Sequence, residues 1–305
     1  SSAGDVNGDG YDDLLVGAKD ADPQGNSSGA SYVVFGKADG FSSTVALSSL
    51  NGVTGFRLDG VAASDQSGIS VSSAGDVNGD GYDDLLVGAP GADPNGSNSG
   101  SSYVVFGKAS FTSTEVVALS SLDGVTGFRL DGVAAGDYSG DSVSSAGDVN
   151  GDGYDDLLVG AGGADPNDRS GSGSSYVVFG KASFTSTEVV ALSSLDGVTG
   201  FRLDGVAAGD YSGDSVSSAG DVNGDGYDDL LVGAKDADPQ GNSSGASYVV
   251  FGKADGFSST VALSSLNGVT GFRLDGVAAS DQSGISVSSA GDVNGDGYDD
   301  LLVGA

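Results

Sequence analysis

One 18-residue string occurs five times in this chain. The string is SSAGDVNGDGYDDLLVGA, and it occupies residues 1–18, 72–89, 144–161, 217–234 and 288–305 without a change. Residues 217–305 also repeat residues 1–89 in full. A fixed period of about 70 residues predicts an array of similar structural units. We therefore divide the 305 residues into a single repeat array with units 1–71, 72–143, 144–216 and 217–287 and a partial unit 288–305. Because the chain starts inside its own motif, we interpret it as a window of a longer repeat protein.

Each unit contains four short runs that fit β-strands. They are residues 13–18, 31–36, 55–59 and 68–72 and their equivalents, which alternate apolar with polar residues or are rich in β-branched and aromatic residues. A weaker run, 44–47, fits a short helical or extended connector. No segment has a sustained apolar period of 3.6 residues, and the 55 glycines disfavour helices. The sequence therefore predicts an all-β fold of tandem four-stranded antiparallel blades of the β-propeller type, either closed into a ring or open as a polymer.

Apolar side chains on these runs are expected to pack between neighbouring units. A single four-stranded sheet cannot bury both of its faces, so repeated sheets must stack face to face. The predicted core consists of Leu14, Val16, Val33, Phe35, Phe56 and Leu58 and their equivalents in later units.

Each copy of the repeated string contains an acidic loop. In the first copy the loop is DVNGDGYDD, residues 5–13, with oxygen-bearing side chains at loop positions 1, 3, 5 and 9 and glycine at position 6. Alternate side chains in such a loop converge on one point, and six to eight oxygen ligands suit a calcium ion. Two carboxylates about 5 Å apart repel by roughly 3 kcal/mol at an effective dielectric of ~20, which a cation between them would relieve. The alternative is an aspartate-rich turn that only favours tight geometry. An EF-hand fits less well, because loop position 12 is Val16 instead of glutamate.

The charge balance excludes several classes of protein. The formal net charge is −32, and the 11 lysines and arginines are too few to neutralise a run of phosphates, so we expect neither a nucleic-acid partner nor binding to an anionic membrane. No apolar run approaches the ~20 residues needed to span a membrane. Histidine and cysteine are absent, which excludes imidazole or thiolate metal sites and the usual activated nucleophiles. Paired carboxylates could serve a glycosidase, but every pair here is repeated with its loop, so we expect no enzymatic activity.

With these residues laid out, the chain resembles the FG-GAP repeat family, known from the N-terminal propeller of integrin α chains and from bacterial surface proteins. The resemblance is carried by SAGDVNGDGYDDLLVGAP at 73–90, YVVFGK at 103–108 and GFRLDG at 127–132, although Ser67-Gly68 stands where the family has Phe-Gly. It implies that the acidic loop joins the first two strands of a blade and binds calcium, about one ion per repeat. The implied ligands, with the tyrosine contributing its carbonyl, are Asp5, Asn7, Asp9, Tyr11 and Asp13; Asp76, Asn78, Asp80, Tyr82 and Asp84; Asp148, Asn150, Asp152, Tyr154 and Asp156; Asp221, Asn223, Asp225, Tyr227 and Asp229; and Asp292, Asn294, Asp296, Tyr298 and Asp300.

Two further residue types recur in every full unit. Asp12 and its equivalents precede a ligand but point the other way along an extended chain, so we expect them to lie behind the ligands or in solvent. Arg57 and its equivalents Arg129, Arg202 and Arg273 are expected to pair with a carboxylate of a neighbouring blade.

These observations predict a non-enzymatic, calcium-binding structural repeat protein, a fibre or cell-surface scaffold that associates with further copies of itself. Millimolar calcium outside cells would fill such loops, which indicates an extracellular or cell-surface location. The alternative is an adhesion module, a propeller that binds a protein or glycan through its variable loops at 19–29, 90–100 and 162–173.

Overall fold

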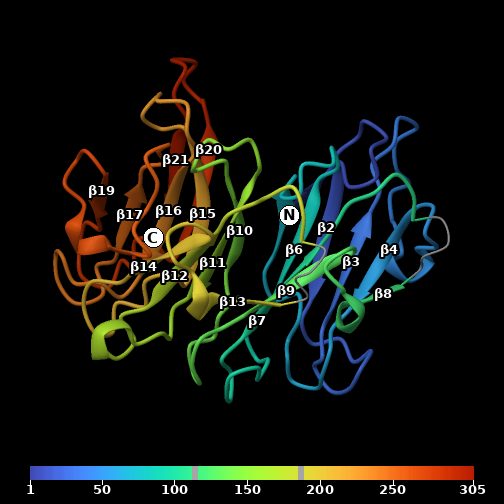
Figure 1. The fold of residues 1–305 in the computed structure, drawn as a ribbon, viewed down its shortest axis with the longest axis horizontal. Coiled ribbons are helices and arrows are strands. Elements are labelled where there is room, and N and C mark those ends of the chain that lie inside the picture. Colours follow the sequence, from blue (N-terminus) through green and yellow to red (C-terminus); the bar gives the residue numbers. More distant parts are fainter. Residues whose placement is uncertain (112–115, 185–188) are drawn as a thin grey trace.

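The computed structural model describes residues 1–111, 116–184 and 189–305. Within them, four strands of each full repeat pair antiparallel in one sheet, and the sheets follow one another from the blue to the red end of the chain (Figure 1). The predicted all-β fold of blade-type sheets is confirmed. The strands of the first sheet, in order, are β1 (Ser2–Gly4), β2 (Asp13–Ala18), β3 (Ala30–Val34), β4 (Gly55–Asp59) and β8 (Val116–Ala118).

The next two sheets repeat this order. The second contains β5 (Val71–Gly75), β6 (Asp84–Ala89), β7 (Ser101–Val105), β9 (Gly127–Asp131) and β13 (Val189–Ala191). The third contains β10 (Val143–Gly147), β11 (Asp156–Ala161), β12 (Ser174–Val178), β14 (Gly200–Asp204) and β18 (Thr260–Ala262).

The last two sheets have fewer strands. The fourth contains β15 (Ser215–Gly220), β16 (Asp229–Ala234), β17 (Ala246–Val250) and β19 (Gly271–Asp275), and the fifth is the hairpin of β20 (Ser286–Gly291) and β21 (Asp300–Gly304). Short 3₁₀ helices lie in the connections: η1 (Leu47–Ser49), η2 (Leu119–Ser121), η3 (Pro166–Asp168), η4 (Leu192–Ser194) and η5 (Leu263–Ser265).

The predicted strands at 13–18 and 55–59 coincide with β2 and β4, and the predicted strand at 31–36 overlaps β3. The predicted strand at 68–72 is shifted, because β5 begins only at Val71. Gly68 has a φ of 86°, a left-handed conformation that a regular strand does not adopt, and its N–H donates to the Gly88 carbonyl across to the next strand. The strand therefore starts only after this turn.

Successive sheets are joined by an exchanged strand. The segments that precede η2, η4 and η5 leave their own units and pair in parallel with the fourth strand of the previous sheet, as when Val116 aligns with Arg57 and Ala118 with Asp59. The same exchange links β13 to β9 and β18 to β14. The weak run is therefore an extended strand followed by a 3₁₀ helix in these three units, and in the first unit only the 3₁₀ helix η1 forms.

The hydrophobic core lies between neighbouring sheets, as the repeat argument predicts. Leu15, Phe56 and Leu58 of the first sheet pack in one buried cluster with Leu85 and Val87 of the second. The same connection that carries the exchanged strand also brings Phe111 back, and its ring stacks on Phe56 with centroids 4.3 Å apart. Equivalent clusters join the second sheet to the third and the third to the fourth.

The two end faces of the array are exposed. Leu14 is 53% and Val16 41% exposed on the first sheet, whereas their equivalents Leu85 and Val87 are buried against it. At the other end, Leu302 of the terminal hairpin is 63% exposed. The predicted core is thus confirmed for the equivalents of Leu14 and Val16 in the next three units, whereas no sheet of the described residues covers Leu14 and Val16 themselves.

Candidate metal centre

The acidic loops all lie at the same end of the strands of their sheets. Each connects the first strand of a sheet to the second, so loop positions 1 to 7 turn the chain at this end and position 9 is the first residue of the second strand, as with Asp84 in β6. In an antiparallel meander the connection between the third and fourth strands lies at this same end. The variable loops join the second strand to the third and therefore lie at the opposite end of the strands.

The carboxylates at the first and fifth loop positions accept hydrogen bonds from backbone N–H groups of their own loop. In the second loop, one oxygen of Asp76 accepts hydrogen bonds from the N–H groups of Gly79 at 2.7 Å and Asp80 at 3.0 Å, and the other accepts from Gly81 at 2.8 Å. Asp80 in turn accepts from the N–H of Tyr82 at 3.1 Å. These are aspartate turns that build a tight loop from local bonds, and the same pattern recurs in the other loops.

The aspartate at loop position 9 is buried in all four complete sheets. Asp84 accepts hydrogen bonds from the N–H of Val77 at 3.1 Å and of Gly107 at 2.9 Å, which tie the loop to the third strand of its sheet. Burial raises the pKa of Asp84 to about 8, and the charges of Asp80 and Asp76 contribute to this increase. Burial likewise raises the pKa of Asp156 to about 8, of Asp229 to about 7 and of Asp13 to about 6. A buried carboxyl beside two other acids is costly to ionise unless a cation compensates its charge.

The predicted ligands share a loop, but their carboxylates face backbone N–H groups. Within residues 1–111, 116–184 and 189–305, no three acidic side chains are gathered into a group that could hold a metal ion. The donor set itself fits calcium, because every donor group at positions 1, 3, 5, 7 and 9 is oxygen and the carboxylates of Asp76, Asp80 and Asp84 each have at least one oxygen with a lone pair beyond its hydrogen bonds.

The aspartate at loop position 8 contacts the loop of the preceding blade. Asp83 accepts a hydrogen bond from the N–H of Asp5 at 2.7 Å, and its own N–H donates to the Asp5 carbonyl at 3.3 Å. The sequence argument placed the whole set behind the ligands or in solvent, and only Asp12, in the first loop, is exposed. For Asp83 and its later equivalents that expectation is incomplete, because the partner is a backbone group of another repeat.

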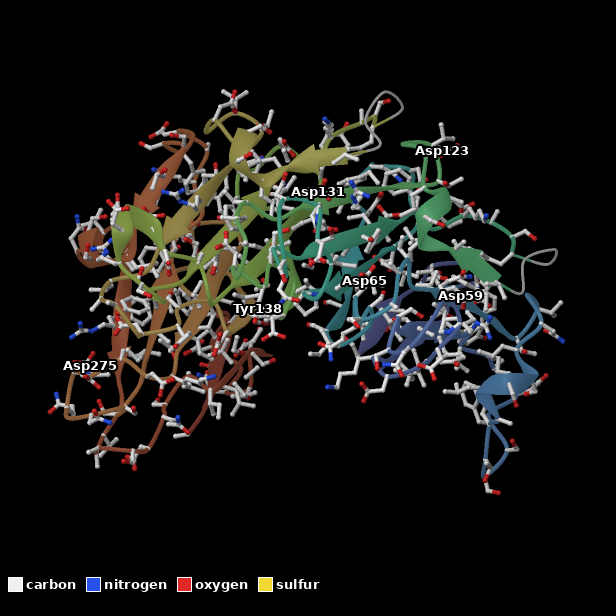
Figure 2. All side chains as sticks on the ribbon, turned by 90° about the horizontal axis from the view of Figure 1, so that it is seen from below. Asp59, Asp65, Asp123, Asp131, Tyr138 and Asp275 are labelled. Carbon is white, nitrogen blue, oxygen red and sulfur yellow. The ribbon has the colours of Figure 1, made fainter. Side chains whose placement is uncertain are left out.

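The recurring arginines pair within their own strand. Arg57 contacts Asp59, Arg129 contacts Asp131, Arg202 contacts Asp204 and Arg273 contacts Asp275, each two residues along and on the same face. Figure 2 labels Asp59, Asp131 and Asp275, which lie on β4, β9 and β19 of three different sheets. The expected pairing between blades is therefore wrong, because alternate residues of a strand share a face and a carboxylate is already within reach.

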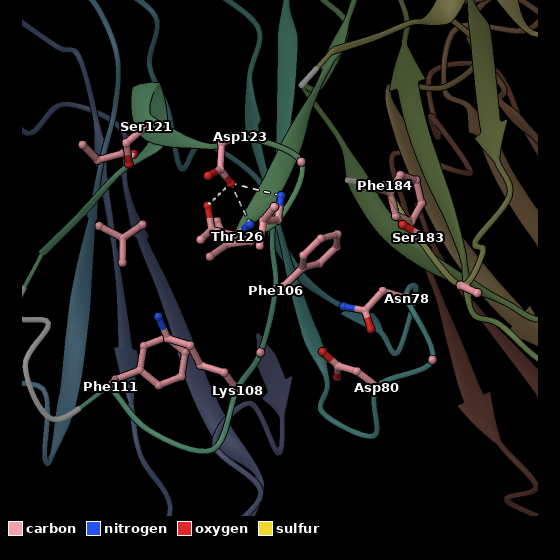
Figure 3. Close-up of a pocket in the computed structure, with 18 of the residues that line it drawn as sticks. Asn78, Asp80, Phe106, Lys108, Phe111, Ser121, Asp123, Thr126, Ser183 and Phe184 are labelled. Carbon is pink, nitrogen blue, oxygen red and sulfur yellow. Dashed lines mark hydrogen bonds between the residues drawn. The ribbon is translucent and has the colours of Figure 1, made fainter. Parts of the chain in front are cut away.

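A groove of about 690 Å³ lies beside the second loop. Asn78 and Asp80 of the loop face Phe106 and Phe184 across it, and Asp123 closes a turn by accepting from Thr126 (Figure 3). Such a turn is a local structural device, so the chemistry available in the groove is that of the loop oxygens and an aromatic wall.

The family model described as the FG-GAP repeat matches residues 1–34, 67–105, 139–178, 212–250 and 283–305. The chain belongs to the FG-GAP repeat family. Each matched segment of FG-GAP sequence contains an acidic loop with its two flanking strands, and the first four segments continue through the third strand.

Among curated relatives, the chain is similar to integrin alpha pat-2 of Caenorhabditis elegans, with 31% identity over 77% of this chain and 17% of that protein. It is also similar to integrin alpha-V of Gallus gallus, with 32% identity over 80% of this chain and 20% of that protein. The FG-GAP array thus spans a fifth or less of the length of these relatives.

The predicted extracellular or cell-surface location agrees with these integrin α relatives. None of the helices in the described part of the chain is long and apolar enough to cross a membrane.

Proposed function

We propose that this FG-GAP array is a calcium-binding, non-enzymatic extracellular scaffold in which one ion stiffens each acidic loop. The observation that carries the proposal is the fully buried Asp84, whose pKa is raised by burial and by the charges of Asp80 and Asp76 in a loop whose side-chain ligands are all oxygen. A divalent cation would hold these groups ionised, and its binding free energy would add to the stability of the hairpin.

Removal of divalent cations tests this part of the proposal. The melting temperature of the chain, followed by circular dichroism, should fall sharply in EDTA and recover when calcium is restored in excess. An Asp80→Ala variant should lose part of the calcium effect, whereas Asp39→Ala, an exposed site outside the loops, should keep all of it. An unchanged melting temperature in EDTA would contradict the proposal.

The scaffold would assemble through its end faces. Leu14 and Val16 are chemically the same as the buried Leu85 and Val87, so the exposed face of the first sheet carries the side chains that elsewhere bury against a preceding sheet. We expect concentration-dependent self-association in analytical ultracentrifugation. Leu14→Asp should abolish it, whereas Val198→Asp, an exposed site in the turn before β14, should leave it unchanged. A chain that stays monomeric at millimolar concentration would exclude the fibre.

Adhesion through the variable loops is the second candidate. Its specific support is the pair Tyr138 and Tyr211. They are 46% and 41% exposed and line a groove of about 590 Å³ at the end of the strands opposite the acidic loops. Both have positive φ, 54° and 52°, and such strain in a non-glycine residue is often found at functional positions. Binding of the chain to a panel of immobilised extracellular-matrix proteins and glycans, lost in Tyr138→Ala, would favour adhesion, and the absence of any binding would favour the scaffold alone.

A further inference from the structure

The acidic loops of neighbouring blades are bound to one another. At each of the four junctions, the position-8 carboxylate of one loop accepts a hydrogen bond from the first backbone N–H of the preceding loop. The four bonds are Asp83 with Asp5 at 2.7 Å, Asp155 with Asp76 at 2.8 Å, Asp228 with Asp148 at 2.9 Å and Asp299 with Asp221 at 2.9 Å.

The contact is reciprocal. The N–H of Asp155 donates back to the carbonyl of Asp76 at 3.3 Å, and the other junctions repeat this bond at 3.2–3.3 Å. The residue that is held on both sides is loop position 1, whose side chain organises its own loop through Gly79, Asp80 and Gly81. The position-8 aspartate of one loop therefore holds the backbone of the position-1 aspartate in the preceding loop, and that position-1 carboxylate is the one that organises the preceding loop.

The tyrosine at position 7 adds a steric contact. Gly79 lies under the ring of Tyr154, so closely that a Cβ on Gly79 would be 2.5 Å from Tyr154 Cε1. Gly8, Gly151 and Gly224 meet the tyrosine of the next loop in the same way, at 2.3–2.4 Å. Gly295 of the terminal hairpin has nothing within 4 Å, so this packing belongs to the junction and not to the loop itself.

One peptide group connects the two loops electronically. The Tyr154 carbonyl, a predicted ligand of the third loop, and the Asp155 N–H, which bonds to Asp76 of the second loop, belong to the same planar peptide unit. Coordination of that carbonyl oxygen would polarise the peptide and strengthen its N–H as a donor. The Asp155 carboxylate also places a negative charge next to the second loop, which favours a cation there.

We propose that Asp83, Asp155, Asp228 and Asp299 are positioning residues that couple the cation sites of adjacent blades, each tightening the site of the blade before it. This inference rests on the proposed calcium binding. Because coupling free energies are reciprocal, occupancy of either loop in a pair favours occupancy of the other, and calcium fills the array cooperatively.

Asp155→Ala in the full 305-residue chain tests the coupling, with Asp12→Ala as its matched control. Asp12 has the same loop position and the same flanking sequence, but it is exposed, with no neighbouring loop bonded to it among the described residues. In calorimetric titration with CaCl₂, Asp155→Ala should weaken one site by about 10- to 100-fold, the range found when a residue supporting a metal ligand is lost. The Asp12→Ala isotherm should superimpose on that of the parent chain.

Paired variants locate the weakened site. Adding Asp155→Ala to Asp80→Ala, which disables the second loop, should change the isotherm no further, whereas adding it to Asp152→Ala, which disables the third loop, should still weaken one site. The opposite pattern would mean that Asp155 serves its own loop and would overturn the coupling.

A second variant and the parent chain separate the possible failures. Asp155→Asn keeps an acceptor oxygen for the Asp76 N–H, so it should fold even if Asp155→Ala does not, and its affinity loss should be smaller but measurable. An isotherm for Asp155→Asn and Asp155→Ala equal to that of a calcium-binding parent chain would refute the coupling alone. A parent chain that takes up no calcium would refute the proposed function and the coupling together.

Discussion

Stripping the protein of divalent cations should reverse the usual direction of its pH dependence near neutrality. Burial raises the folded-state pKa of Asp84 and of Asp156 to about 8, from an ordinary value of 3.8. Between these values the folded chain keeps a proton on each carboxyl that the unfolded chain has lost, so stability is full below about pH 4 and declines as the pH rises toward 8. Each group contributes a slope of about −1.4 kcal/mol per pH unit, and the two together about −3 kcal/mol per unit between pH 5 and 7.

Urea unfolding of the stripped protein at pH 5, 6 and 7, monitored by far-ultraviolet circular dichroism, measures this slope. Asp84→Asn should lower the measured slope by about 1.4 kcal/mol per pH unit, whereas the exposed Asp39→Asn should leave it intact. In saturating calcium the slope should shrink or change sign, because cation binding requires the ionised carboxylates. A stripped protein whose unfolding midpoint is constant from pH 5 to 7 would refute the assignment of buried, protonated aspartates.

Two packing predictions concern the junctions between blades. Phe128→Ala should destabilise the protein by about 3–5 kcal/mol in urea unfolding, because Phe128 is fully buried and its ring stacks on Phe184 at 4.2 Å; a loss below about 1 kcal/mol would contradict its place in the core. Gly88→Ala should cost about 1–3 kcal/mol, since the new Cβ would lie 1.9 Å from the Gly140 carbonyl oxygen, whereas the equivalent Gly304→Ala has no atom nearer than 3.3 Å and should be nearly neutral. Equal effects at the two glycines would show that the close approach is unimportant.

Local sequence pattern was sufficient for the strands that pair with their neighbours in the chain. The runs at β2 and β4 were predicted with their observed bounds because alternation and β-branched composition are local signals. The strand predicted at 68–72 begins later, at Val71, because the left-handed φ of Gly68 is set by a bond to Gly88, 20 residues further along the chain. The exchanged strand at Val116–Ala118 could not be predicted as such, because its partner belongs to the previous repeat and its own pattern is only three residues long.

The same distinction separates the parts of the candidate metal centre. The loop residues were predicted from spacing, since side chains at positions 1, 5 and 9 act on backbone groups within the same unit. The role of Asp83 was missed, because its partner is the backbone N–H of Asp5, 78 residues away. Every residue except proline has such an N–H, so residue type does not indicate which one Asp83 binds. The arginine pairing was misplaced for the converse reason: Asp59 lies only two residues from Arg57, and the local partner prevails over the distant one.

Crystals of the chain grown in calcium would test the central claim most directly. An anomalous difference map should contain one peak in each of the five acidic loops, with oxygen atoms of the predicted ligands at about 2.3–2.6 Å. In the second loop these would come from Asp76, Asn78, Asp80, the Tyr82 carbonyl and Asp84. A map at saturating calcium with no peak in the loops, and with their aspartates still bonded only to backbone N–H groups, would contradict the account.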